Sequence, residues 1–141
     1  MKKLGFTLIE LLIVVSLIII IGTMTAPFAS GFLIRVYQES TVNSLISSLH
    51  RAQSLSLDGK GSGVWGICKT GNFIRVYQGS CASPTIKEDS SIPSTVAVTG
   101  LNDITFSRLN GEPSSALAIS IVSGAGTKNI TLNEIGVVDV N

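Results

Sequence analysis

The chain has 141 residues, of which 45% are hydrophobic and 13% charged, and its mean hydropathy is +0.48. Ten Lys and Arg residues against nine Asp and Glu residues leave a formal net charge of +1. The length allows one small domain, and the charge balance excludes a polybasic nucleic-acid binder and a disordered charged protein. The mean hydropathy is high for a chain whose whole surface faces water.

The apolar residues are concentrated near the N-terminus. Over the first 34 residues the only ionisable side chains are Lys2, Lys3 and Glu10. The mostly apolar segment 6–28 has 23 residues, and a helix that crosses a bilayer needs about 20. Because the two lysines precede this segment and none directly follows it, we expect a cytoplasmic N-terminus and an exported remainder.

Three interpretations of the segment compete: a cleaved secretory signal, an ordinary membrane anchor and a more specialised element. A secretory signal needs small residues spaced as Ala-x-Ala after its apolar run, and the sequences ending at Ala26 and Ala29 fit this rule poorly. A buried acid such as Glu10 costs about 3 kcal/mol at the centre of a membrane helix. The acid therefore favours a specialised element.

The first residues resemble a known export signal. The sequence Lys2-Lys3-Leu4-Gly5-Phe6-Thr7-Leu8-Ile9-Glu10-Leu11-Leu12-Ile13-Val14-Val15 is similar to the class III leader of type IV prepilins and type II secretion pseudopilins. The resemblance implies that a prepilin peptidase cleaves between Gly5 and Phe6, and that the new amine of Phe6 is N-methylated. Residues 1–5 would then be the leader, and 6–28 would remain as a transmembrane and filament-core helix.

The same resemblance gives Glu10 a role in assembly. In such filaments the glutamate is thought to neutralise the N-terminal amine of the adjacent subunit, and a buried carboxylate needs a partner of this kind. The alternative is that Glu10 lies at the headgroup level near the membrane face. Gly22 and Pro27 mark the expected position of a helix kink.

A second helical segment follows the apolar one. Apolar residues at a spacing of three and four predict that 29–58 continues the helix as an amphipathic element, ending near Leu57. The glycines at 59, 61 and 63 suit a helix stop. A phosphate-binding glycine loop would precede a helix, so we reject nucleotide binding.

The remainder, 64–141, reads as an exported β domain. Alternating patterns predict strands at 64–69, 73–78, 95–98, 104–109, 116–122, 128–132 and 136–140, with a polar loop at 79–94. Asn110-Gly111 is a strong hairpin-turn signal. We therefore expect an α+β, pilin-like fold: a long N-terminal hydrophobic helix followed by a small antiparallel β domain of two sheets.

The body resembles the GspH/FimT group of minor pseudopilins and minor pilins. The similar segments are Trp65-Gly66-Ile67-Cys68, 106–113 and 130–138. The resemblance implies a structural, minor subunit of a type II secretion pseudopilus or type IV pilus, held in the inner membrane before assembly. A major pilin, or a DNA-binding minor pilin, is the alternative. The tail after Lys128 has no Lys or Arg, which makes nucleic acid an improbable partner because phosphate contacts need cations.

The expected partners follow from this resemblance. They are other pilin or pseudopilin subunits, the prepilin peptidase and methyltransferase, an inner-membrane assembly platform and the membrane itself. We expect no small-molecule substrate.

Few residues suggest a disulfide, a metal site or catalysis. Cys68 and Cys81 are candidates for a disulfide if the domain lies in an oxidising compartment, and two buried thiols are the alternative. His50 is the only histidine, so a zinc site would need ligands at no recognisable spacing. No Ser/His/Asp arrangement is visible. We therefore expect no catalytic residues, no metal and no cofactor.

Overall fold

The structure is a computed structural model that describes residues 7–59, 61 and 63–141, without the side chains of 24–29. The chain divides into two compact units, 1–33 and 34–141. The division falls inside helix α1 (Leu8–Leu57), so one helix contributes to both units. Each unit is described by itself.

Helix α1 has defined ends. Its last turn is followed by Gly59, whose φ of 61° suits the left-handed residue that commonly terminates a helix. The N–H of Gly59 donates to the carbonyl of Ser56 (3.3 Å). The predicted helix end at Leu57 is confirmed.

The first sheet has the strand order β3-β2-β1-β5 and is antiparallel at each pairing. Its strands are β1 (Trp65–Thr70), β2 (Phe73–Gly79), β3 (Pro84–Ser91) and β5 (Ile104–Phe106). The predicted hairpin is present, with Ile67 opposite Val76 and Cys68 opposite Arg75. Because side chains alternate along a strand, the first of these pairs faces the core and the second faces outward.

The second sheet has the order β4-β6-β7-β8 and is also antiparallel. Its strands are β4 (Val96–Thr99), β6 (Leu117–Ser123), β7 (Gly126–Leu132) and β8 (Val138–Val140). The chain crosses from the first sheet to β4, returns for β5 and crosses again to β6.

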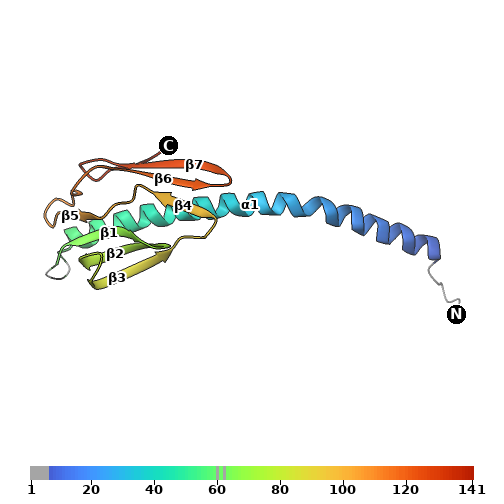
Figure 1. Cartoon of the computed structure of the whole chain (residues 1–141), viewed down its shortest axis with the longest axis horizontal. Helices are drawn as coiled ribbons and strands as arrows, with labels where there is room; N and C mark the ends of the chain where they lie inside the picture. Colours follow the sequence, from blue (N-terminus) through green and yellow to red (C-terminus); the bar gives the residue numbers. More distant parts are fainter. Residues whose placement is uncertain (1–6, 60, 62) are drawn as a thin grey trace. The chain divides into compact units, whose positions relative to one another are not determined.

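The core of the second unit joins α1 to both sheets. Figure 1 shows β6 and β7 on one side of α1 and β1 to β3 on the other. Apolar side chains from all three elements form a single buried cluster. Its fully buried members include Leu45, Leu49, Ile67, Ile104, Ile119 and Ile130. Polar side chains bind the layers together as well: the buried Ser56 hydroxyl donates to the carbonyls of Phe106 (2.8 Å) and Ser107 (3.0 Å).

One sequence expectation for the strands is wrong, and a second is met only in part. The segment expected to be a polar loop, 79–94, contains β3, whose backbone pairs with β2 from Phe73 to Gly79. The Asn110-Gly111 signal does turn the chain back on itself, because Phe106 and Pro113 form an antiparallel bridge and the N–H of Ser107 donates to the carbonyl of Glu112 (2.9 Å). The turn does not join β5 to β6, which belong to different sheets. Within this tight loop, the N–H of Gly111 donates to the Ser107 carbonyl (3.0 Å).

The fold is α+β with two antiparallel sheets, but the expected membrane-crossing N-terminal helix is wrong. Within the described part of the chain, no helix combines the length and the apolar character needed to cross a bilayer. The described, mostly apolar side chains at the start of α1 run from Leu8 to Thr23. At 1.5 Å per residue they cover about 24 Å of a hydrocarbon core of about 30 Å. The single-pass inner-membrane placement inferred from that helix is wrong for the same reason.

Candidate functional site

The most unusual surface of the first unit is the apolar start of α1. Twelve Leu, Ile and Val side chains between Leu8 and Ile21 are 43–78% exposed. We call residues 8–21 the α1 apolar segment. They surround the helix rather than forming one stripe, and a helix that is apolar on all sides is normally buried by other structure. Exposed apolar surfaces of this extent mark interaction sites.

The N-terminus of α1 is capped by the side chain of Thr7. The N–H of Glu10 donates to Thr7 Oγ1 (3.4 Å), and the N–H of Leu11 donates to the Thr7 carbonyl (3.2 Å). Thr7 and Glu10 thus occupy the first and last positions of the Thr-x-x-Glu capping-box pattern. An acid in the first turn also interacts favourably with the helix dipole. The Thr-x-x-Glu spacing is visible in the sequence and would have predicted this capping role for Glu10, but it was missed.

Four other N-terminal residues have predicted roles: Gly5, Phe6, Gly22 and Pro27. Gly5 and Phe6 lie outside the described residues, so cleavage, N-methylation and pairing of Glu10 with an amine stay predictions. Helix α1 continues through Gly22 and Pro27. The kink at these two residues also stays a prediction, since only the helical backbone is described at Pro27.

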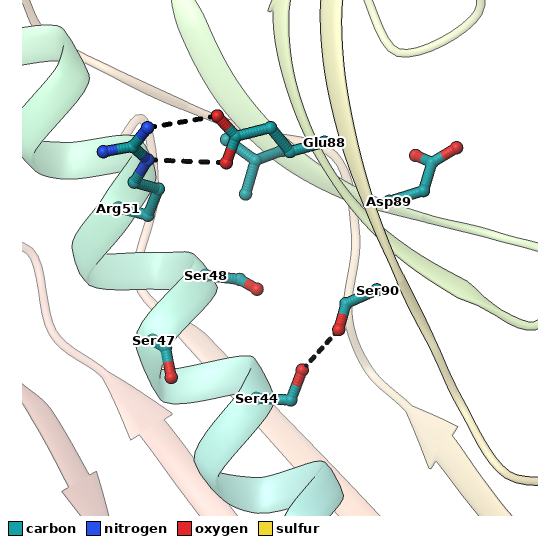
Figure 2. Close-up of a pocket in the computed structure, with 8 residues that line it drawn as sticks. Ser44, Ser47, Ser48, Arg51, Glu88, Asp89 and Ser90 are labelled. Carbon is teal, nitrogen blue, oxygen red and sulfur yellow. Dashed lines mark hydrogen bonds and ion pairs between the residues drawn. The ribbon is translucent and has the colours of Figure 1, made fainter.

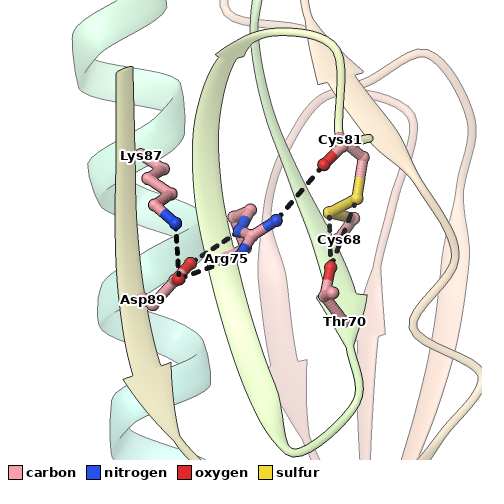
Figure 3. Close-up of polar contacts among 6 residues, drawn as sticks. All are labelled: Cys68, Thr70, Arg75, Cys81, Lys87 and Asp89. Atoms are coloured by element: carbon pink, nitrogen blue, oxygen red, sulfur yellow. Dashed lines mark hydrogen bonds and ion pairs between the residues drawn. A yellow bond between two sulfur atoms is a disulfide. The ribbon is translucent and has the colours of Figure 1, made fainter. Parts of the chain in front are cut away.

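In the second unit, the predicted disulfide between Cys68 and Cys81 is present, with a Cα–Cα distance of 6.3 Å (Figure 3). Cys68 lies on β1, and Cys81 lies in the connection between β2 and β3. Arg75 Nη1 donates to the carbonyl of Cys81 (3.4 Å), which helps to fold this connection back over the sheet.

Beside the disulfide, Arg75 and Asp89 form a bidentate ion pair. Arg75 Nε and Nη2 donate to the two carboxylate oxygens of Asp89 at 2.7 and 2.9 Å, and Lys87 Nζ lies 3.9 Å from the same carboxylate (Figure 3). The hydrogen bonds from Arg75 lower the pKa of Asp89 below its usual value, and the charges of Arg75 and Lys87 add to this. Sequence reasoning missed this pair because it did not recognise β3.

Tyr77 lies on β2 two residues after Arg75, so its side chain is on the same face of the first sheet. Its side chain is buried and occupies the space that a Cβ at residue 66 would need, which explains the glycine there. The Tyr77 hydroxyl donates to Asp103. Burial raises the pKa of Tyr77 strongly, and the Asp103 carboxylate raises it further. The phenol therefore stays protonated at neutral pH and donates to Asp103.

A polar groove of about 380 Å³ lies between α1 and β3. Figure 2 shows Arg51 reaching Glu88 across the groove and Ser44 facing Ser90. The Arg51–Glu88 ion pair measures 3.2 Å and the two serine oxygens are 2.7 Å apart. Since these groups bind one another, the groove has no activated nucleophile.

The described residues contain no metal-binding cluster. No group of three or more His, Cys, Asp or Glu side chains among them could hold a metal ion, and His50 is exposed on the helix surface. Comparison with known proteins found no match to a family model, a curated protein or a solved structure. The α1 apolar segment is therefore the main candidate site.

We predict that loss of the disulfide destabilises the second unit. A bridge that closes a loop of about 14 residues contributes about 3 kcal/mol in the chain-entropy model. The double variant Cys68→Ser, Cys81→Ser should lower the free energy of unfolding by about that amount, measured by denaturant titration with the fluorescence of the buried Trp65. An unchanged free energy of unfolding would contradict this prediction.

We also predict that the Arg75–Asp89 pair makes stability depend on acid pH. Because the folded pKa of Asp89 is lowered, its contribution is present above the ordinary carboxyl value of 3.8 and is lost as pH falls through the folded pKa. Asp89→Asn should be less stable than wild type at neutral pH and lose less stability on acidification. The control is Asp139→Asn, which removes an exposed carboxylate without an ion-pair partner in the described residues. Equal acid sensitivity of wild type and Asp89→Asn would refute the prediction.

Proposed function

We propose that the chain is a structural subunit of a type IV pilus-like or type II secretion filament. Subunits assemble by packing the α1 apolar segment of each against the same segment of its neighbours. The exposure of this segment is the observation that supports the proposal. The similarity of residues 2–15 to a prepilin leader is the reason for proposing a pilus-like or secretion filament rather than another assembly.

The size of the apolar surface favours several neighbours over one. Covering a Leu, Ile or Val side chain completely contributes about 1.5–3 kcal/mol, and these twelve side chains are about half exposed. Complete coverage would then contribute on the order of 10 kcal/mol, against an association cost of about 4–15 kcal/mol. A single partner covers only one side of a helix. Stable association therefore needs neighbours on several sides, as in a filament core.

Glu10 supports a specific register within such a core. Its carboxylate would lie among apolar helices with little water, where an unpaired charge is strongly unfavourable. We propose that the amine of Phe6 on a neighbouring subunit pairs with it after leader cleavage. The chain is then a substrate of the prepilin peptidase and methyltransferase and is not itself an enzyme.

We predict that Glu10→Gln reduces filament assembly without unfolding α1. Glutamine preserves the capping-box pattern but removes the charge that would pair with an amine. The measurement is the amount of the chain in sheared filaments relative to its total in the cell, which should fall sharply for Glu10→Gln.

The matched control is Glu39→Gln, which removes another exposed acid from α1 and one surface ion pair, to Lys128 (2.6 Å). Such pairs contribute little, so assembly should be normal. Wild-type assembly by Glu10→Gln would contradict the charge-pairing role. Failure of the wild-type chain to appear in any filament would contradict the proposed function.

A further inference from the structure

Strand β3 is the longest of the four strands that lie at the edge of a sheet. It has eight residues and pairs on one side only, with β2, whereas the other edge strands have three or four residues. An edge strand presents a row of unpaired backbone N–H and C=O groups, which proteins normally cover or interrupt. The treatment of each edge therefore shows which of them is left open.

The chain covers the edges of β5 and β4 itself. Segment 112–114 lies beside β5, where the N–H of Ser114 donates to the Thr105 carbonyl (2.8 Å). On β4, the carbonyl of Val98 accepts a hydrogen bond from Lys69 Nζ (2.7 Å). Both edges have thus lost backbone groups that another strand would need.

The edges of β8 and β3 differ in the same respect. On β8, the N–H of Val140 donates to the carboxylate of its neighbour Asp139 (2.9 Å). The backbone of β3 makes no hydrogen bond to any described residue outside its pairing with β2. Among the described strands, β3 is therefore the edge that the chain leaves open.

The register of β3 identifies the open backbone groups. In an antiparallel pair, residues that bond to the partner strand alternate with residues whose N–H and C=O point away from it. The N–H of Ile92 donates to the Asn72 carbonyl (2.7 Å), which fixes this alternation. Lys87, Asp89 and Ser91 therefore direct their backbone groups to the free edge.

The charged side chains of β3 are drawn away from this edge. Asp89 pairs with Arg75 on the outer face of the sheet, and Lys87 lies 3.9 Å from the same carboxylate. Glu88 pairs with Arg51 on the opposite face, toward α1. These contacts neutralise charges that would otherwise repel an added strand, and they hold β3 from both faces. A strand fixed in this way loses little entropy when a partner binds.

The polar groove between α1 and β3 lies on the face of the strand that carries Glu88 and Ser90 (Figure 2). Ser44 and Ser90 share a hydrogen bond there, and the half-buried Ser48 has no hydrogen-bond partner among the described residues. Apolar side chains in the groove would leave these hydroxyls unsatisfied, which is unfavourable. Charged ones would find no net opposite charge, because Arg51 and Glu88 neutralise each other. The groove therefore suits uncharged side chains that form hydrogen bonds.

We infer that β3 binds an extended segment of another protein, which adds to the first sheet as a further strand. In such strand addition, main-chain hydrogen bonds provide affinity and alternate side chains provide specificity. The segment carries Ser, Thr, Asn or Gln at every second position, where side chains enter the groove. This binding site is separate from the α1 apolar segment and does not depend on filament assembly.

Peptide selection on the full-length chain in a non-ionic detergent tests the site. The probe is a phage-displayed library of random peptides longer than the eight residues of β3. We expect enrichment of sequences with Ser, Thr, Asn or Gln at alternate positions. Absence of enrichment, or enrichment of apolar or charged residues at those positions, would overturn the proposed partner.

Variants of β3 and of the groove then locate the bound peptide. Lys87→Pro removes an N–H at the free edge, where proline is tolerated, and should weaken binding of a selected peptide by about tenfold. The matched control is Lys87→Ala, which removes the same side chain, keeps the N–H and should bind like wild type. Ser48→Ala should weaken binding by about fivefold, as expected for one neutral hydrogen bond. Equal binding by wild type, Lys87→Pro and Ser48→Ala would overturn the site.

Amide hydrogen exchange provides a readout that needs no substitution. The amides of Lys87, Asp89 and Ser91 should exchange rapidly in the free chain and slowly with a selected peptide bound. Their neighbours on β3, which bond to β2, should be protected in both states. Protection of the three edge amides without peptide, rising with the concentration of the chain, would show that a second copy occupies β3 and would overturn the inference.

Discussion

The apolar surface of α1 between Leu8 and Ile21 is the constraint on which the account depends. The chain leaves twelve large aliphatic side chains of this segment substantially exposed. Water contact with this surface is unfavourable, and because it surrounds the helix, its complete burial would need apolar contacts on more than one side. Under the proposed function, this surface of the helix would drive assembly.

The same helix also organises the second unit. Its apolar side chains between Val42 and Leu55 occupy the space between two antiparallel sheets. The polar contacts of Ser56 and Gln53 fix the loops at the end of the helix. One helix thus combines an apolar surface that is exposed with an apolar surface that its own chain buries. The disulfide and the Arg75–Asp89 pair then stabilise the outward face of the first sheet.

The sequence was most informative where local signals agree with the core. Period-two alternation predicted the β1–β2 hairpin, and glycine after an amphipathic run predicted the end of α1. β3 was missed because most of its residues are exposed and include Lys87, Glu88 and Asp89, so no apolar alternation marks it. The ion pair of Asp89 with Arg75 depends on that strand and was missed with it. The Asn110-Gly111 signal predicted a reversal of the chain, which is present between Phe106 and Pro113, but β5 and β6 belong to different sheets, so no two-strand hairpin forms. The disulfide was predicted from an inferred compartment and required the connection after Gly79 to fold back, and the structure shows the bridge.

The most direct test is the mass of the N-terminal peptide of the protein isolated from sheared filaments. A processed filament subunit should give a peptide that begins at Phe6 and is heavier by one methyl group, because only such a subunit presents the amine that Glu10 would pair with. A chain that still begins at Met1, or one cleaved near Ala26 or Ala29, would contradict it.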